Sequence, residues 1–243
     1  MPYKTELHCH TSEFSRCANQ SGVDKVQVYL DAGYTSVVVT NHFCSYYPEH
    51  KNYEKFTRDF FAAADVMREA AGDRLHIITG MELTFSENGN DYLVYGFDEE
   101  TLLSLPEIFD MGLAGFYPWA KEHGIIIVQA HPLRFNIRTR EPWLLDGIEI
   151  YNGGHHQFCN DAAMAWADLY DHHYNDDGRY FIRTSGSDHH RPDQFATGGI
   201  ETDEPLITIE DVVTTLKSGN YRLVTRMGTF SPTEGWPVTG SQG

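Results

Sequence analysis

The chain has 243 residues, of which 41% are hydrophobic, and a formal net charge of −17 at pH 7. This length suits one large domain with a full core, and such acidity argues against stable binding of long nucleic acids or anionic membranes. The sequence has no apolar run near the ~20 residues of a membrane span and no signal-peptide core. Its 4 cysteines show no CxxC spacing, so we expect reduced thiols in a cytoplasmic protein.

Short β-rich segments alternate with helical segments along the chain. Strands are predicted over 3–9, 35–42, 75–83, 91–97, 124–131, 147–153, 180–188 and 221–227. Helices are predicted over 22–34, 53–72, 106–123, 161–174 and 209–219. This alternation indicates α/β class with a mostly parallel sheet, and it fits a distorted, TIM-like (β/α)7 barrel better than an open sheet. We predict a single domain over 1–228 and a Pro/Gly/Ser-rich tail over 229–243, on the surface or disordered.

Polar side chains that can bind metal recur where the predicted strands end. They are His8, His10, His42, Glu82, Asp98, His131, Asn152, Asp188 and His190. Any one of them alone is more often a cap or a surface group, but the carboxyl ends of barrel strands converge on one face, where active sites form. His8 and His10 stand two apart on a strand, so both can hold one ion while Cys9 points away. A set of His, Asp and Glu without thiolates suits catalytic Zn²⁺, Mn²⁺ or Fe²⁺.

Taken together, these motifs resemble the PHP (polymerase and histidinol phosphatase) family. The resemblance rests on HxH in the first strand, Thr-Asn-His after the second, GxE after the third, a late Ala-His-Pro and a Ser-Asp-His-His run. It extends from His8 to His190, with every motif in the family's order. The resemblance implies a distorted barrel with a site for two or three divalent metal ions and hydrolysis of phosphoesters.

The resemblance also implies which residues hold the first two ions. One ion would be held by His8, His10, Glu82 and Asp188. Glu82 would bridge to a second ion, held also by His131 and by Asp98, where many members have His. In a two-ion site of this kind, the ions clamp the attacking and leaving oxygens of a phosphoester.

The third ion is the one for which this sequence departs from the family. The resemblance assigns it to His42 and His190 and places a further His at position 16, where this chain has Arg16. A guanidinium stays protonated and cannot ligate, so either Cys17 substitutes, or the third ion is absent or bound largely by water. Asn41 stands where Asp is usual, which should weaken the orientation of the ligands around it.

We therefore predict a phosphoesterase that hydrolyses a small phosphorylated metabolite or nucleotide by attack of metal-bound hydroxide. The predicted catalytic residues are His42, Glu82 and Asp188. The predicted substrate-binding residues are Arg134 and Arg16, because a phosphate needs cationic partners besides metal, and Asn152. Long nucleic acids and membranes are not expected as partners, and no oligomeric state is predicted.

Two other classes of function remain open from the sequence. The same cluster could activate water against an amide, as in metal-dependent amidohydrolases, although those usually carry a carboxylated Lys at a strand end and no Lys ends a predicted strand here. A non-catalytic metal-binding domain is the other alternative, motivated by Asn41 and by the missing ligand at position 16. Against it, candidate ligands for two ions are all present.

Overall fold

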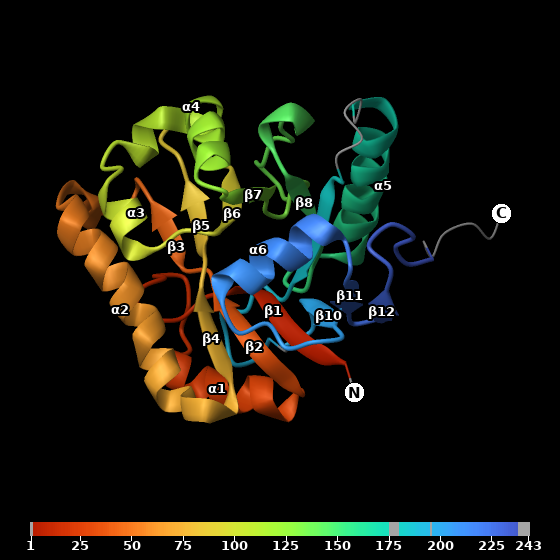
Figure 1. Ribbon diagram of the computed structural model, residues 1–243, viewed down its shortest axis with the longest axis horizontal. Coiled ribbons are helices and arrows are strands. Elements are labelled where there is room, and N and C mark those ends of the chain that lie inside the picture. Colours follow the sequence, from red (N-terminus) through yellow and green to blue (C-terminus); the bar gives the residue numbers. More distant parts are fainter. Residues whose placement is uncertain (1, 175–179, 195, 238–243) are drawn as a thin grey trace.

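The structure is a computed structural model that describes residues 2–174, 180–194 and 196–237. The described strands form two six-stranded mixed sheets (Figure 1). The first has the order β12-β11-β10-β1-β2-β4, from β1 (Tyr3–Cys9), β2 (Tyr34–Val39), β4 (His76–Thr79), β10 (Ile200–Thr202), β11 (Arg222–Thr225) and β12 (Gly228–Phe230). The second has the order β3-β5-β6-β7-β8-β9, from β3 (His42–Cys44), β5 (Met81–Thr84), β6 (Asp91–Tyr95), β7 (Ile126–Gln129), β8 (Gly147–Asn152) and β9 (Ile182–Gly186).

The chain connects the two sheets on both sides of the predicted site. β3 begins shortly after β2 ends, and β5 begins shortly after β4 ends. The hydrogen bond from Gly80 N to Val39 O (3.0 Å) extends the pairing of β2 with β4 to the point where the chain passes into the second sheet. On the other side, β1 meets the end of β9 through a bridge between Cys9 and His189 and a 3.2 Å bond from His10 N to His189 O. The ends of strands from both sheets therefore face one another.

The predicted α/β class is confirmed, but a closed barrel of parallel strands is not. β6 runs antiparallel to both β5 and β7, and β10, β11 and β12 pair antiparallel as well. The reason for the reversal at β6 is the short connection over 85–90, since parallel neighbours need a crossover of about a dozen residues or more. The predicted strands lacked β10 and β12, which are short pieces of three residues each.

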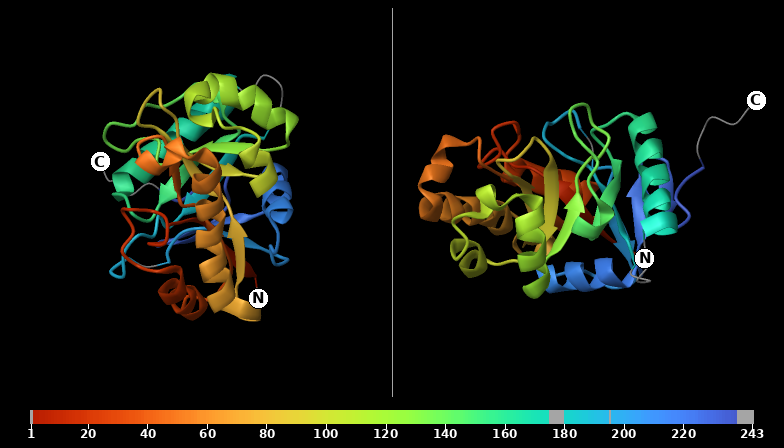
Figure 2. Two further views of the ribbon diagram at one scale, coloured as in Figure 1. Left: turned by 90° about the vertical axis from the view of Figure 1, so that its left-hand side faces the viewer. Right: turned by 90° about the horizontal axis from the view of Figure 1, so that it is seen from above.

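The helices cover the outer faces of the sheets (Figures 1 and 2). They are α1 (Gly22–Asp31), α2 (Tyr53–Ala71), α3 (Glu99–Leu103), α4 (Ile108–Glu122), α5 (Gln157–Tyr174) and α6 (Ile209–Ser218), with short 3₁₀ turns at Pro48–Lys51, Gly72–Arg74 and Pro142–Leu144. Side-chain caps mark the starts of two of them, since Ser21 and Asn52 accept hydrogen bonds from the first turns of α1 and α2. No helix of the described chain is long and apolar enough to cross a membrane.

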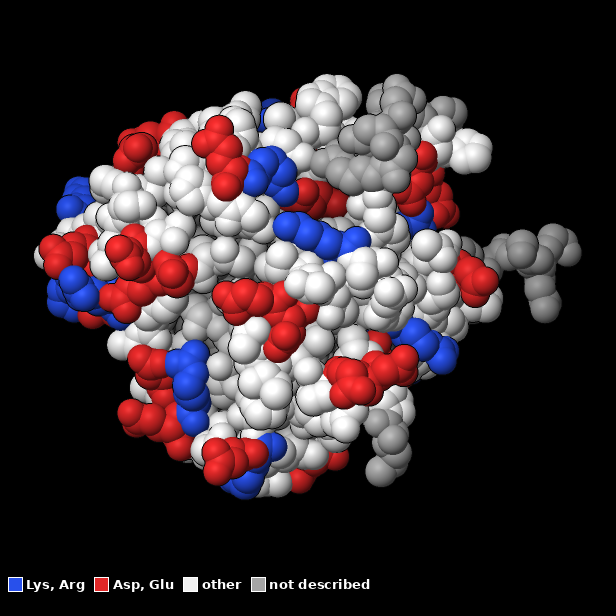
Figure 3. Space-filling model, viewed as in Figure 1, with Lys and Arg blue, Asp and Glu red and all other residues white. Residues whose placement is uncertain are grey.

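Two groups of buried side chains form the core. The larger one fills the second sheet and the helices around it, and the smaller one lies under α1 and α2. Trp236, in the segment predicted as a tail, is buried and donates a hydrogen bond from Nε1 to Asp161 of α5 (2.7 Å), while 238–243 lie outside the described residues. Acidic side chains spread over many elements of the face in Figure 3, interspersed with Lys and Arg.

Candidate metal centre

Glu82 lies at the centre of a buried cluster of imidazoles. Its Oε1 lies 2.9 Å from Nε2 of His131 and 3.4 Å from Nε2 of His8. Its Oε2 lies 2.8 Å from Nδ1 of His42 and 3.3 Å from Nε2 of His10. These side chains lie at the carboxyl end of β1, just past the ends of β2 and β4 where β3 and β5 begin, and just past the end of β7, where the two sheets adjoin.

Asp188 faces Glu82 from the other side of the imidazoles. Its Oδ1 lies 3.4 Å from Nε2 of both His8 and His10 and 3.2 Å from Nδ1 of His190. Asp188 has φ 51° and His131 has φ 29°, in the left-handed region that costs a non-glycine residue about 1–3 kcal/mol. The strained backbone at two predicted ligands is typical of a functional site.

The donor atoms are arranged as a set of overlapping candidate metal sites. Four groups of three have ligand atoms within 4.8 Å of one another: His8–His10–Asp188, His8–Glu82–His131, His42–Glu82–Asp91 and His10–His42–His190. Nδ1 of His42 and Oε2 of Glu82 are buried without a hydrogen-bond partner in the described chain, although only 2.8 Å separates them. The two atoms are close but misaligned for a hydrogen bond, whereas a cation could bind both, so the nitrogen and oxygen donors fit divalent metal ions.

A buried carboxylate that the sequence analysis missed holds the ligands in place. Oε1 of Glu149 lies 2.8 Å from Nδ1 of His8, and its Oε2 accepts from the backbone N of His131 (3.0 Å). Asn152 donates from Nδ2 to Glu149 (2.9 Å) and to Asp188 (3.2 Å). The one signal in the sequence was an acidic residue in the middle of an apolar strand, GIEIYN. Such carboxylates fix the tautomer and orientation of ligating imidazoles.

The predicted ligand Asp98 lies away from this cluster, and Asp91 occupies the expected place. Asp98 is exposed and caps α3, since its Oδ1 accepts from Thr101 N (2.8 Å). Asp91 is buried and forms a candidate site with His42 and Glu82. Because β6 runs antiparallel to its neighbours, its first residue rather than its last lies at the edge where the other ligands gather.

This correction predicts opposite effects for two conservative changes. Asp91→Asn should lower the metal content of the purified protein, because an amide is a weaker ligand than a carboxylate. Asp98→Asn should leave the metal content unchanged, since Asn is also a good helix cap. Elemental analysis of both variants checks this; equal metal loss in both, or loss only in Asp98→Asn, would overturn the assignment.

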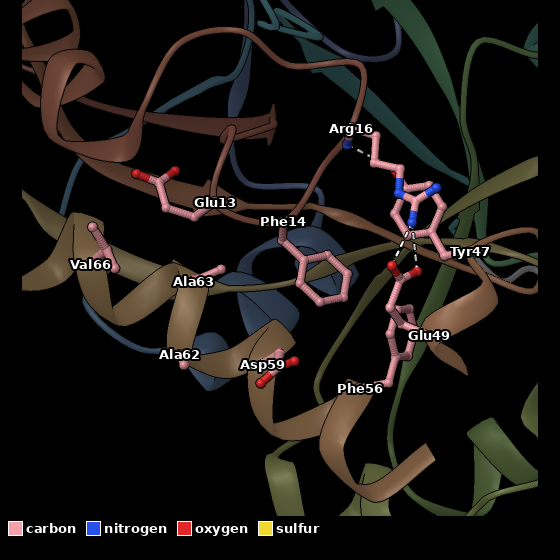
Figure 4. Close-up of a pocket in the computed structure, with 10 residues that line it drawn as sticks. All are labelled: Glu13, Phe14, Arg16, Tyr47, Glu49, Phe56, Asp59, Ala62, Ala63 and Val66. Carbon is pink, nitrogen blue, oxygen red and sulfur yellow. Dashed lines mark hydrogen bonds and ion pairs between the residues drawn. The ribbon is translucent and has the colours of Figure 1, made fainter. Parts of the chain in front are cut away.

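The predicted substrate-binding residues lie in three different settings. A cavity of about 700 Å³ opens onto the cluster, and Arg134 is an exposed part of its lining. Arg16 also borders this cavity, but its Nη2 is paired with Glu49 (2.5 and 2.7 Å) and its guanidinium lies over the ring of Tyr47 at 4.9 Å (Figure 4). Asn152 is buried behind Asp188, where it orients the carboxylate rather than facing the cavity.

Asn41 has a structural role beside the cluster. Its Oδ1 accepts from Thr11 N and from Ser15 Oγ, both at 2.8 Å. Ser15 Oγ in turn lies 3.2 Å from Nδ1 of His10 and accepts from the backbone N of His42 (3.0 Å). Asn41 therefore orders the loop after β1 and, through Ser15, the two histidines beside it.

In the metal-free cluster, the carboxylates raise the pKa values of His8 and His42, and the imidazoles lower those of Glu82 and Asp188. Burial lowers the pKa of His8 and His42, but nearby carboxylates outweigh it: Glu149, Asp188 and Glu82 for His8, and mainly Glu82 for His42, so both pKa values are raised well above 6.5. Burial raises the pKa of Glu82 and Asp188, but the imidazoles outweigh it and lower both well below their ordinary values. These shifts favour the protonated forms of His8 and His42 in the metal-free site.

These shifts predict that metal binding releases protons. A ligating imidazole nitrogen must be unprotonated, so the apparent affinity should rise with pH, roughly tenfold per pH unit for each proton released. In the metal-free protein, stability from the raised pKa values is present below pH 6.5 and is lost as pH rises through the folded pKa values. Titration calorimetry with Zn²⁺ at pH 7 in buffers of different ionisation enthalpy measures the release; a buffer-independent heat would contradict it.

Comparisons with known proteins agree on the fold. The sequence significantly matches no family model and no curated protein. A two-domain protein from Bacteroides vulgatus, which contains a predicted PHP-like metal-dependent phosphoesterase, aligns with TM-score 0.60 and 16% identity over 93% of this chain. This chain spans 65% of that protein's length.

Two further solved structures have the same fold. One, from Bifidobacterium adolescentis and provisionally named a metal-dependent phosphoesterase, aligns with TM-score 0.51 and 16% identity over 87% of this chain and 96% of its own. An amidohydrolase from Chromobacterium violaceum aligns with TM-score 0.53 and 15% identity over 91% and 98%. The fold of this chain is therefore that of PHP-like metal-dependent phosphoesterases, as its motifs predicted, and the amidohydrolase shares it.

Proposed function

We propose that the protein is a metal-dependent phosphoesterase acting on a small phosphorylated metabolite or nucleotide. The proposal rests chiefly on the position of Glu82. This carboxylate contacts four imidazoles at the base of the 700 Å³ cavity and faces Asp188. A carboxylate whose two oxygens each lie near two imidazole nitrogens is suited to bridge two cations.

The ligand set divides naturally between two ions. His8, His10 and Asp188 with Glu82 would hold the first. His131 with Glu82, and Asp91, whose Oδ2 lies 3.9 Å from Nε2 of His131, would hold the second. When bound, such ions act as Lewis acids toward phosphoryl oxygens and lower the pKa of water. Zn²⁺, Mn²⁺ and Fe²⁺ all suit these nitrogen and oxygen donors.

The residues at the mouth of the cavity support an anionic substrate. Arg134 and Arg191 are exposed there and can donate paired hydrogen bonds to phosphoryl oxygens. His155 lines the same cavity, with Nε2 3.9 Å from Oδ2 of Asp188. Burial and the nearby His131 lower the pKa of His155, so it is neutral at pH 7 and can accept a proton or a hydrogen bond from substrate.

The amidohydrolase alternative is favoured by one structural neighbour and opposed by the cavity. No Lys lines the cavity in the described part of the chain. The buried Lys25 lies on α1 and donates from Nζ to the backbone O of His189 (2.8 Å), which leaves Glu82 as the bridging group in place of a carboxylated Lys. A non-catalytic metal-binding domain is the other alternative, and the open cavity over the cluster argues against it.

The proposal is tested by activity and metal content together. The protein is stripped of metal, reloaded with Mn²⁺ or Zn²⁺, and assayed against phosphomonoesters, phosphodiesters and amides, with the metal content measured in each sample. Metal-dependent release of phosphate or cleavage of a diester is expected, and it should vanish in the stripped protein. Amide cleavage without phosphoester cleavage would favour the amidohydrolase, and bound metal with no hydrolysis would favour the non-catalytic domain.

A further inference from the structure

The cavity over the metal cluster is larger than a phosphoryl group requires. Its volume of about 700 Å³ lies within the range of sites that enclose a whole small-molecule ligand. In the proposed function the phosphoryl group lies at the base of the cavity, near Glu82 and Asp188, and Arg134 and Arg191 line the same cavity. Most of the space is then left for the rest of the substrate, so the side chains around this space determine which substrates fit.

Tyr46 is an exposed aromatic residue in the lining of this cavity. It is 59% exposed, and among the large hydrophobic residues that are exposed in the described chain it alone lines the cavity. Tyr46 follows the end of β3 by two residues, and β3 begins with the candidate ligand His42. The segment that supplies part of the metal cluster therefore also carries an exposed ring into the space left for the substrate.

The ring of Tyr46 is supported by a neighbour that is itself held in place. It packs perpendicular to the ring of the buried Tyr47, with centroids 5.2 Å apart and an interplanar angle of 85°. The OH of Tyr47 accepts from the backbone N of Arg16 (2.9 Å). The Arg16 guanidinium, paired with Glu49, lies over the Tyr47 ring at 4.9 Å (Figure 4). A supported aromatic side chain loses little conformational entropy when a ligand packs on it.

We propose that Tyr46 stacks on a planar ring of the substrate, which makes the substrate a phosphoester whose leaving group carries an aromatic or heteroaromatic ring. Stacking requires an exposed aromatic side chain in a fixed place, and Tyr46 provides one. Arg134 and Arg191 supply positive charge for the phosphoryl group in the same cavity. The inference deepens the proposed function and rests on it for the position of the phosphoryl group.

Two ligands that differ in the ring test this inference. Adenosine 5′-monophosphate and ribose 5-phosphate share the sugar phosphate, and only the first carries a base. In the metal-reloaded protein, Tyr46→Ala should raise KM for adenosine 5′-monophosphate about tenfold with kcat unchanged, because stacking stabilises the bound substrate and the transition state equally. KM for ribose 5-phosphate should change by less than about twofold. An equal increase for both ligands, or no increase for either, would overturn the proposal.

Two further variants separate stacking from other roles of this side chain. Tyr46→Phe keeps the ring and should keep the wild-type KM for both ligands, whereas a KM increase as large as in Tyr46→Ala would show that the hydroxyl is the contact and refute stacking. Trp143→Ala is the matched control, because Trp143 is also 59% exposed but does not line the cavity. It should leave both KM values unchanged, and elemental analysis should find the wild-type metal content in all three variants.

Equilibrium dialysis of the metal-stripped protein measures binding without turnover, so it separates the inference from the proposed function. The wild type should bind adenosine 5′-monophosphate more tightly than ribose 5-phosphate, and Tyr46→Ala should lose this preference. That result would support the ring site even if no phosphoester is cleaved. Conversely, metal-dependent phosphoester hydrolysis by a protein that binds the two ligands equally would leave the proposed function standing and refute the ring site alone.

Discussion

Glu82→Gln is expected to abolish phosphoester hydrolysis while leaving the protein folded. The loss should be on the order of a thousandfold or more, because Glu82 contacts four imidazoles and would bridge the two ions. The fold should persist because His8 and His42, whose raised pKa values depend partly on this carboxylate, can lose their protons when it is removed. Steady-state kinetics with matched elemental analysis and circular dichroism measure the three effects.

Glu100→Gln is the control that matches this change in charge. Glu100 is exposed on α3, so its replacement removes one negative charge and leaves the cluster untouched. Activity and metal content should equal those of the wild type. Activity close to the wild type in Glu82→Gln would exclude a bridging role for this carboxylate.

Gly186→Ala is expected to destabilise the protein and disturb the metal site together. Gly186 ends β9 directly against β1, and a Cβ there would lie 2.3 Å from Cβ of His8 and 2.7 Å from Oε1 of Glu149. One of the two must shift, which breaks the 2.8 Å contact that orients His8. We expect a loss of about 1–3 kcal/mol in the free energy of unfolding, measured by urea denaturation, with reduced metal content.

Gly89→Ala provides the comparison for this prediction. Gly89 lies in the connection between β5 and β6, has a negative φ, and has no atom within 4 Å of an added Cβ. Its replacement should leave stability within about 0.5 kcal/mol and metal content unchanged. If Gly186→Ala behaved in the same way, the close approach of β9 to β1 would not be what positions His8.

Most of the candidate ligands could be predicted because each lies at the end of an apolar run that reads as a strand. His8, His10, Glu82, His131 and Asp188 were found in this way, and the structure brings them together. Asp91 could not be found by the same rule, because β6 runs antiparallel and presents its first residue at the site. The six-residue connection over 85–90 was the available signal for that reversal.

Residues that support the ligands are much harder to read from a sequence. Glu149 contacts His8, and Asn41 acts on His10 through Ser15, yet each pair is far apart in the chain. Contacts within such pairs depend on which strands lie side by side, and the local pattern of a single sequence does not show this. For the same reason the α/β class is confirmed while the parallel TIM-like barrel is not, since strand pairing depends on tertiary contacts rather than on local pattern.

The sequence by itself determined the α/β class, the order of most strands and helices, and the residue types of a metal cluster, because hydrophobic periodicity and strand-end chemistry are local properties. Only the tertiary structure decided which carboxylate belongs to the cluster, which groups hold its imidazoles, and that Arg16 is paired with Glu49. Those outcomes depend on strand direction and side-chain packing, in which residues distant along the chain contact one another.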